Sequence, residues 1–264
     1  METESTVLGL AHWWDLVIVL AVALVGGAIN AVAGGGTILT FPTLLALGVP
    51  PVNANTTNAV GLLPGSAGGA WGFRHEMAQA SRWWFWLLIP SLIGGVFGAY
   101  LLVNLPSKIF ASIAPYLVLL ATVLIALQPL VERFLRLGSS SGHSLFQRGA
   151  AVLVLFVIAA YGGYFGASIG ILMLTALGLV GMTDVAQANG MKNLLSIAIK
   201  GAAIIYFAFT GDVLWGIAIV MAVGAVIGGY AAGAIGHRIG EPVLRWVVVA
   251  IGIGVAIVMI IEIS

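Results

Sequence analysis

Residues 13–47 have the sequence WWDLVIVLAVALVGGAINAVAGGGTILTFPTLLAL, in which a long apolar run, three glycines and a shorter apolar run follow one another. A helix needs roughly 20 apolar residues to cross about 30 Å of hydrocarbon. The first run is long enough. The second spans only about half that thickness, at about 1.5 Å per residue. The stretch therefore predicts a membrane-spanning helix followed by a half-helix.

The composition of the whole chain leads to the same environment. Of its 264 residues, 61% are hydrophobic and 7% are charged. A soluble domain carries about a quarter charged residues, because water must solvate its surface. Most of this surface must therefore face lipid. The net charge of +1 gives no case for nucleic acid, and the absence of cysteine excludes disulfides and zinc–thiolate sites.

Ten apolar segments follow one another along the chain. Two of them, Asn53–Trp71 and Val185–Phe209, are long enough to cross a membrane but carry polar residues. Two are short, Thr37–Leu47 and Ile169–Leu179, and each follows a glycine-bearing break. The other six have the length and composition of spanning helices: Trp13–Val32, Trp83–Val103, Lys108–Leu127, Arg148–Phe165, Val213–Ile235 and Val243–Ile261.

The order of these segments repeats. A shift of 134 positions places Ala54-Asn55 on Ala188-Asn189 and Gly36 on Gly170. We therefore predict an all-α polytopic membrane protein of two repeats, each with about four full spanning helices plus a broken or short half-helix. The predicted first repeat, linker and second repeat are residues 1–130, 131–147 and 148–264.

The arginines indicate how the repeats are oriented. All seven lie in three clusters near segment ends: Arg74 and Arg82; Arg133, Arg136 and Arg148; Arg238 and Arg245. The positive-inside rule places all three clusters on the cytoplasmic side of the cell membrane. If each short helix counts as a crossing, the repeats are inverted, both termini lie outside and the linker is cytoplasmic. Re-entrant hairpins formed by the broken pairs would give the same parity.

A polar stripe follows one helix of the second repeat. Asn189, Lys192, Asn193, Ser196 and Lys200 recur at the spacing of one α-helical face. Ionisable side chains at membrane depth are costly and usually mark the path of a substrate or an ion. The alternative for Lys192 is that its stem extends to the headgroups. The first-repeat counterpart carries Asn55 and Asn58 at equivalent positions.

The two breaks are the second set of candidate binding residues. A helix that starts within the membrane has free backbone N–H groups and a positive dipole end, which together suit an anion. The alternative is that the glycines only let helices pack closely. The candidates are Gly34, Gly35, Gly36 and Thr37 in the first repeat and Ser168 and Gly170 in the second.

The charges near the stripe favour an anionic ligand, since two lysines have a single neighbouring carboxylate, Asp184. The sequence contains no phosphate-binding loop, no His-Glu-x-x-His motif and no other catalytic constellation. We therefore expect a protein that is not an enzyme and that needs neither a cofactor nor a metal.

Several motifs resemble those of a known family. Asn30–Thr37, Gly48–Pro51 and Ala54–Thr57 resemble the first repeat of the sulfite exporter TauE/SafE family, and Tyr161–Gly170 resembles its second. The similarity covers nearly the whole chain. It implies transport of sulfite, sulfoacetate or a related sulfur-containing or organic anion across the bacterial cytoplasmic membrane.

The leading hypothesis is a secondary transporter that exports a small anion by alternating access between the repeats. Sulfite, an organosulfonate or a related oxyanion or carboxylate would fit. The alternatives are a passive anion channel and a non-transporting membrane scaffold, although a scaffold does not need a lysine at membrane depth. The expected partners are the small anion and the lipid bilayer, and the sequence leaves open whether the chain forms a homo-oligomer.

Overall fold

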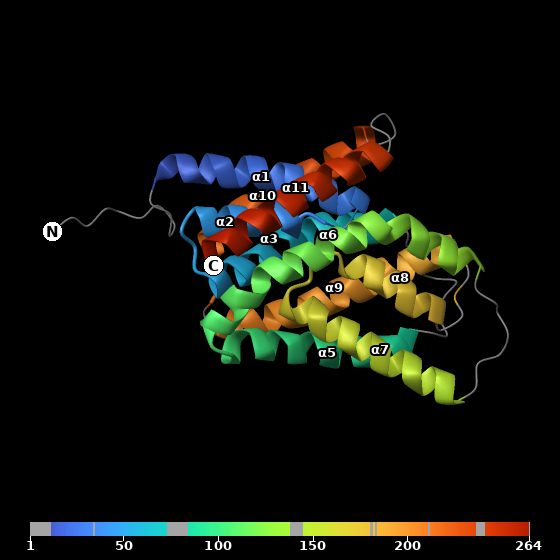
Figure 1. Cartoon of the computed structure of the whole chain (residues 1–264). Coiled ribbons are helices and arrows are strands. Elements are labelled where there is room, and N and C mark those ends of the chain that lie inside the picture. Colours follow the sequence, from blue (N-terminus) through green and yellow to red (C-terminus); the bar gives the residue numbers. More distant parts are fainter. Residues whose placement is uncertain are drawn as a thin grey trace.

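The structure, a computed structural model, is helical wherever it has regular secondary structure within the residues that it describes (Figure 1). Gly34 of the first predicted break lies outside those residues. The described residues are 12–33, 35–72, 84–137, 145–179, 182, 184–210, 212–235 and 241–263.

Ten helices are formed by these residues, five from each half of the chain. The first half contributes α1 (Trp13–Ala33), α2 (Thr37–Ala46), α3 (Pro51–Gly72), α5 (Trp84–Asn104) and α6 (Ser107–Leu137). The second half contributes α7 (Leu145–Tyr164), α8 (Ile169–Leu179), α9 (Val185–Thr210), α10 (Trp215–Ile235) and α11 (Glu241–Ile263). Each helix coincides with one predicted segment, so the all-helical architecture is confirmed.

Length and composition identify candidate membrane spans among the described helices. Four stretches are both long and apolar enough to cross a bilayer: Trp13–Asn30, Trp86–Asn104, Ser107–Val131 and Gly190–Thr210. Five further helices contain shorter apolar stretches. Both described ends of the predicted linker, residues 131–147, are helical, because α6 continues to Leu137 and α7 begins at Leu145.

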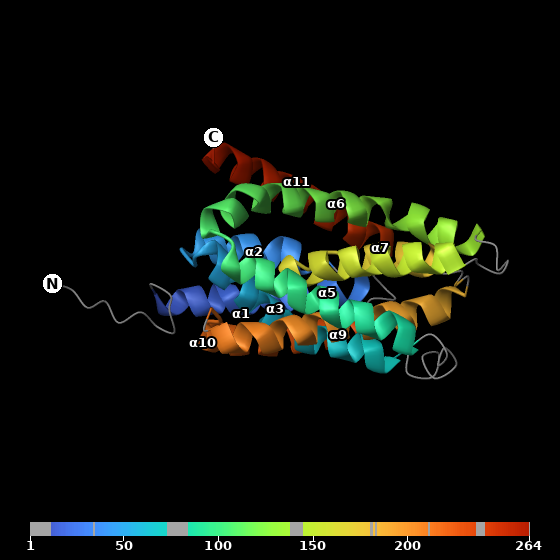
Figure 2. The same cartoon turned by 90° about the horizontal axis from the view of Figure 1, so that it is seen from below.

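The long helices lie side by side in one bundle. In both views α1 begins and α11 ends at the same end of the bundle, whereas α6 ends and α7 begins at the opposite end (Figures 1 and 2). Each half of the chain therefore begins at one end of the bundle and finishes at the other. The two short helices pack on their predecessors, α2 on α1 and α8 on α7.

The outer face of the bundle is apolar. Trp86, Phe209 and Tyr230 are 74%, 87% and 81% exposed, and many smaller apolar side chains on α1, α5, α6, α10 and α11 are exposed with them. A continuous apolar surface of this kind is not stable in water. The arrangement agrees with a multi-pass membrane protein whose outer face contacts hydrocarbon.

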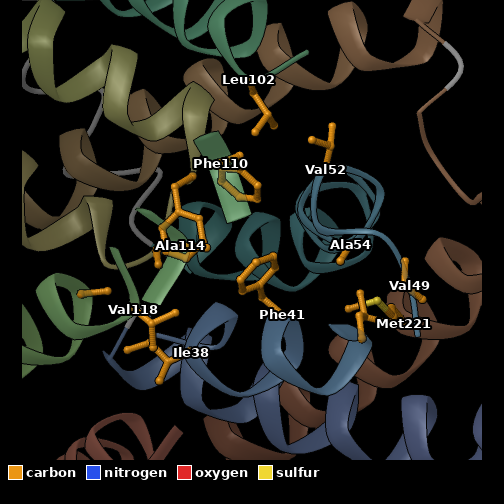
Figure 3. Close-up of a cluster of buried hydrophobic side chains, with 14 of the residues drawn as sticks. Ile38, Phe41, Val49, Val52, Ala54, Leu102, Phe110, Ala114, Val118 and Met221 are labelled. Atoms are coloured by element: carbon orange, nitrogen blue, oxygen red, sulfur yellow. The ribbon is translucent and has the colours of Figure 1, made fainter. Parts of the chain in front are cut away.

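An aromatic cluster ties the two halves together. Phe41 of α2 lies edge-on to Phe110 of α6 at 5.9 Å and to Phe165, just after α7, at 5.4 Å between ring centroids. Phe41 and Phe110 are fully buried, among aliphatic side chains from α2, α3, α5 and α6 (Figure 3). The short helix of the first half is therefore packed against the break of the second.

Glycines allow the closest helix contacts. A Cβ on Gly98 of α5 would overlap the carbonyl oxygen of Ala160 in α7, and one on Gly228 of α10 would overlap that of Leu24 in α1. Small residues that let backbones approach are typical of helix packing in membranes. Backbone atoms cannot move aside as flexible side chains can, so these contacts do not tolerate a methyl group.

Replacing Gly98 by alanine should therefore separate α5 from α7 and destabilise the fold by about 1–3 kcal/mol. Gly149 of α7 is the matched control, since it is exposed and nothing lies within 4 Å of the point that a Cβ would occupy there. Gly149→Ala should be neutral or slightly stabilising, because alanine favours the helix. Thermal unfolding in detergent would measure both variants, and equal effects would contradict the packing role.

Candidate functional site

The polar side chains that the sequence singles out lie mainly on α3 and α9, which pack against each other within the bundle. Asn55 and Asn58 of α3 are 2% and 1% exposed, and Lys200 of α9 is 9% exposed. Buried polar groups need partners, because leaving one unpaired in an apolar interior is costly. Which of these side chains have partners therefore distinguishes a structural role from a binding role.

At the first break, the polar groups satisfy one another. Asn58 donates to the Thr37 hydroxyl at 3.2 Å, and the Thr40 hydroxyl shares its one proton between Asn58 Oδ1 and the Gly36 carbonyl, the latter at 3.0 Å. A Cβ on Gly36 would overlap the carbonyl of Gly26 in α1. Gly35 faces Ile125 of α6 in the same close way. The first turn of α2 is thus closed by neutral hydrogen bonds and close packing.

The second break has a different backbone. Gly166 and Ser168 both have positive φ, +74° and +56°, so the chain turns sharply between α7 and α8. Glycine suits this conformation because it has no Cβ. Two side chains hold the turn, since the Tyr161 hydroxyl donates to the Ala167 carbonyl at 2.8 Å and Ser168 donates to the Ala121 carbonyl at 3.0 Å. These contacts anchor the break to α7 and α6.

The start of α8 has free donors. Among the described residues, the backbone N–H groups of Ala167, Ser168 and Ile169 make no hydrogen bond. The first turn of any helix leaves such groups unpaired, and they carry the positive end of the helix dipole. Here they lie inside the bundle, since all three residues are buried.

Lys200 lies beside this turn. Its Cε is 3.8 Å from the position that a Cβ would occupy on Gly166, so the lysine stem lies in ordinary contact range of this glycine. Within the part of the chain that the structure describes, its ammonium group has neither a hydrogen-bond nor an ion-pair partner. A buried charge without a partner is strongly unfavourable.

The stem of Lys192 packs against the first turn of α8. Its Cδ lies 3.2 Å and its Cε 3.7 Å from the point that a Cβ would occupy on Gly170, the second residue of α8. A cation beside a helix N-terminus opposes the helix dipole. The stems of both lysines therefore contact the break between α7 and α8.

Of the remaining members of the stripe, Asn193 and Ser196 lie between these lysines on α9, and Asn189 precedes them. The Ser196 hydroxyl is buried without a hydrogen-bond partner among the described residues, and Asn193 is half-buried. Asn189 lies one turn before Asn193 on the helix backbone, but its side chain lies outside the described residues. Asp184, the neighbouring carboxylate, caps α9 by accepting a hydrogen bond from the Gln187 N–H at 3.2 Å.

Asn55 brings the first half of the chain to the second break. Its side-chain nitrogen donates to the Tyr164 carbonyl at 2.8 Å, while its Oδ1 is buried with no partner in the described structure. The structure thus places Lys192, Lys200, Asn55, Ser168 and Gly170 around one turn. It places Asn58, Thr37, Gly35 and Gly36 in the separate network at the first break. Both breaks pack on neighbouring turns of α6.

Other polar residues of α3 hold a connection in place. Asn53 and Thr56 donate to the Asp212 carbonyl at 2.9 and 2.8 Å, and the Leu214 N–H donates to Thr57 at 3.0 Å. These bonds fix the chain just before α10. These hydrogen bonds account for the polar residues on this part of α3.

Some contributors to the second break were not identified from the sequence. The carbonyl groups of Tyr164 and Ala167 are part of it, and the sequence signal for them is the glycine- and aromatic-rich stretch 161–170. The sequence predicts Gly166 as the first residue of this break but not as a binding residue. No group of three or more histidine, aspartate or glutamate side chains that could hold a metal is found among the described residues.

Comparison with known proteins identifies the family. The family model described as sulfite exporter TauE/SafE matches residues 19–259. This chain belongs to the sulfite exporter TauE/SafE family. The match covers both breaks and the two polar helices α3 and α9, and it confirms the resemblance noted from the sequence motifs.

Curated relatives of this TauE/SafE chain carry transporter names. A "Probable membrane transporter protein ORF9" of Sinorhizobium sp. is 25% identical over 92% of this chain and 91% of its own length. A "Probable membrane transporter protein" of Haemophilus influenzae is 28% identical over 81% and 82%. The Escherichia coli K12 "Probable membrane transporter protein YfcA" is 25% identical over 89% and 85%. No solved structure matches the chain.

The family and the apolar helices make this chain a transmembrane transporter of the sulfite exporter family. Membership of a transporter family also agrees with the expectation that the chain is not an enzyme.

Gly166 should tolerate substitution less well than a glycine of similar backbone conformation outside the site. Gly166→Ala places a Cβ 2.7 Å from the Gly162 carbonyl oxygen as well as in a left-handed conformation. Gly48, at the end of α2, is the matched control, because its φ is +82° but nothing lies within 4 Å. Gly48→Ala should destabilise the fold by about 1–2 kcal/mol, and Gly166→Ala by more, as measured by thermal unfolding. Equal losses would show that the contacts around Gly166 are unimportant.

Proposed function

We propose that this chain is a secondary transporter that exports a small anion across the cell membrane by alternating access at the second break. The observation that carries the proposal is Lys200, a buried residue whose ammonium group has no partner among the described residues. Moving an ion out of water costs several kcal/mol even after relaxation. A protein retains such a group where a ligand of opposite charge offsets the cost.

The surroundings of Lys200 favour an anion in particular. Lys192, the free N–H groups at the start of α8 and the Ser196 hydroxyl all supply donors or positive charge near the same turn. Backbone N–H groups at a helix N-terminus bind oxyanions well. Sulfite, an organosulfonate or a related oxyanion or carboxylate presents several acceptor oxygens to such a set. The family description supports the same class of substrate.

Alternating access requires two halves that can exchange roles, and the helix packing supports an inverted pair. The contacts occur in matching sets: α1 packs on α10 as α7 packs on α5, and α3 packs on α10 as α9 packs on α5. Exchanging the two halves converts each contact into its partner. Inverted repeats with broken helices and a midplane site are typical of secondary transporters.

Glycine contacts repeat with the helices. A Cβ on Gly27 would overlap the backbone of Ala225, and one on Gly163 would overlap the backbone of Gly95. Likewise Gly228 meets Leu24 as Gly98 meets Ala160. Gly98 and Gly228 are 130 positions apart, four fewer than the shift of 134 that aligns the two halves of the sequence. Four residues are about one helical turn. Connections of different length between the helices of the two halves account for the difference.

A membrane orientation follows from the arginine clusters. The end of the bundle at which α1 begins and α11 ends would face outward, and the end at which α6 meets α7 would face the cytoplasm. Both termini would then lie outside, as the loop charges predict.

Two positions on α6 test this orientation, because the chain has no cysteine of its own. Ser107 and Arg133 are exposed near opposite ends of that helix. In intact cells, Ser107→Cys should react with a membrane-impermeant maleimide, whereas Arg133→Cys should react only after permeabilisation. The reverse pattern would invert the proposed orientation, and labelling of both positions in intact cells would contradict a spanning α6.

Lys200→Met tests the anion site, because methionine keeps most of the stem volume and removes the charge. This variant should lose the thermal stabilisation that sulfite, sulfonates or carboxylates give to the wild-type protein. The ligand-free variant should be at least as stable as wild type, since a desolvated charge is gone. Lys200→Arg should recover little binding, because a planar guanidinium does not replace a compact ammonium in a fitted site.

Lys108→Met is the matched control, since Lys108 is exposed at the start of α6. It should keep the stabilisation by anions. In liposomes, wild-type flux should saturate with anion concentration as expected for a carrier, whereas a channel would show a reversal potential and no saturation. Wild-type binding and transport by Lys200→Met would remove Lys200 from the substrate site.

A further inference from the structure

The amide group of Asn55 has a defined orientation. The backbone carbonyl of Tyr164 can only accept a hydrogen bond, so the Asn55 atom that lies 2.8 Å from it must be the amide nitrogen. The other end of the amide, Oδ1, is therefore an acceptor that is not used in this contact. It is buried and has no partner among the described residues. An acceptor in this state needs a donor from elsewhere.

Asn58 shows that this situation is particular to Asn55. Asn58 lies one turn further along α3 and is just as buried. Its Oδ1 accepts a hydrogen bond from Thr40, and its nitrogen donates to Thr37. The same side chain in the same helix is thus satisfied at one position and half-satisfied at the next.

The unused acceptor lies close to the proposed anion site. Asn55 bonds to Tyr164, and the stem of Lys200 packs on Gly166, two residues further along the chain. Two residues span at most about 7 Å. Asn55 from the first half and Lys200 from the second therefore contact the same short segment.

We infer that the transported anion carries a hydrogen-bond donor beside its negative charge, and that Asn55 Oδ1 accepts it. The inference rests on the proposed function, in which Lys200 binds the anionic group. Lys200 and the free N–H groups of α8 serve acceptor oxygens, whereas Asn55 Oδ1 serves only a donor. The matching ligand class is an anion with an O–H or N–H group, such as a hydroxy- or amino-sulfonate or a singly protonated oxyanion.

A ligand with acceptors alone would fit this site poorly. Sulfate, or an alkylsulfonate without a hydroxyl or amino group, would leave Asn55 Oδ1 unpaired. It would also bring a negatively charged oxygen toward that acceptor. Sites that hydrogen-bond a particular group discriminate strongly against analogues that lack it, because the buried partner is left unpaired. Asn55 would therefore be a specificity-determining residue, while Lys200 supplies the charge.

A pair of ligands that differ by one hydroxyl tests the inference directly. Ethanesulfonate and 2-hydroxyethanesulfonate would be titrated into the purified full-length protein by calorimetry at one pH. The hydroxylated ligand should bind at least about ten-fold more tightly. Equal affinity, as expected if a buried water already satisfies Oδ1, or tighter binding of ethanesulfonate would overturn the inference.

Variants separate recognition from a structural role. Asn55→Ala should lower the affinity for 2-hydroxyethanesulfonate to that for ethanesulfonate, so that the ten-fold preference disappears. A purely structural role for Asn55 would weaken both ligands alike and leave the preference unchanged, which would contradict the inference. Asn58→Ala is the matched control and should keep the preference whatever it does to the two affinities. If Asn55→Ala does not fold, the ligand pair on the wild-type protein still decides.

Lys200→Met distinguishes failure of this inference from failure of the proposed function. If neither ligand binds to the wild-type protein, or if both bind Lys200→Met as tightly as wild type, the anion site is wrong and the inference falls with it. If both ligands bind equally and both depend on Lys200, the anion site stands and only the donor requirement is wrong.

Discussion

Backbone N–H and C=O groups at membrane depth must find partners in the protein or line a cavity, and the rest of this structure depends on how two broken helices meet that demand. At the second break, side-chain hydrogen bonds tie the turn to the rest of the bundle, while the N–H groups of Ala167, Ser168 and Ile169 have no partner among the described residues. Asn55 of the first half holds the Tyr164 carbonyl, and Ser168 holds the carbonyl of Ala121 in α6. The break can persist only where these helices converge. The same convergence surrounds the turn beside Lys200 with polar groups from both halves.

Close helix packing makes this convergence possible, and glycine serves it in two ways. At the first break, Gly35 and Gly36 fill sites where a side chain would overlap α6 or α1. At the second, a side chain on Gly170 would crowd the stem of Lys192, while the stem of Lys200 lies in ordinary contact range of Gly166. The glycines of the first break thus admit neighbouring helices, whereas Gly170 admits a lysine stem.

Apolar length predicted all ten helices, including the two short ones, because hydrocarbon thickness sets a length that a sequence must meet. Helical spacing predicted that Lys192, Ser196 and Lys200 share a face. Contacts between distant segments were not predictable in this way. Nothing local indicates that Asn55 bonds to Tyr164, or that the neighbouring polar residues of α3 hold the chain before α10. Those partners are set by how helices from different halves pack, which periodicity within one helix does not encode.

The two halves carry side chains of different charge at equivalent positions beside their breaks. Asn58 and Lys192 occupy equivalent positions, yet Asn58 closes the start of α2 with neutral hydrogen bonds while Lys192 lies over the start of α8. A lysine in place of Asn58 would bury another charge in the same bundle, at a further cost of several kcal/mol. In the proposed carrier, an anion offsets that cost at one break only. Confining Lys192 and Lys200 to the second half therefore keeps the cations at the break where the proposed ligand would bind.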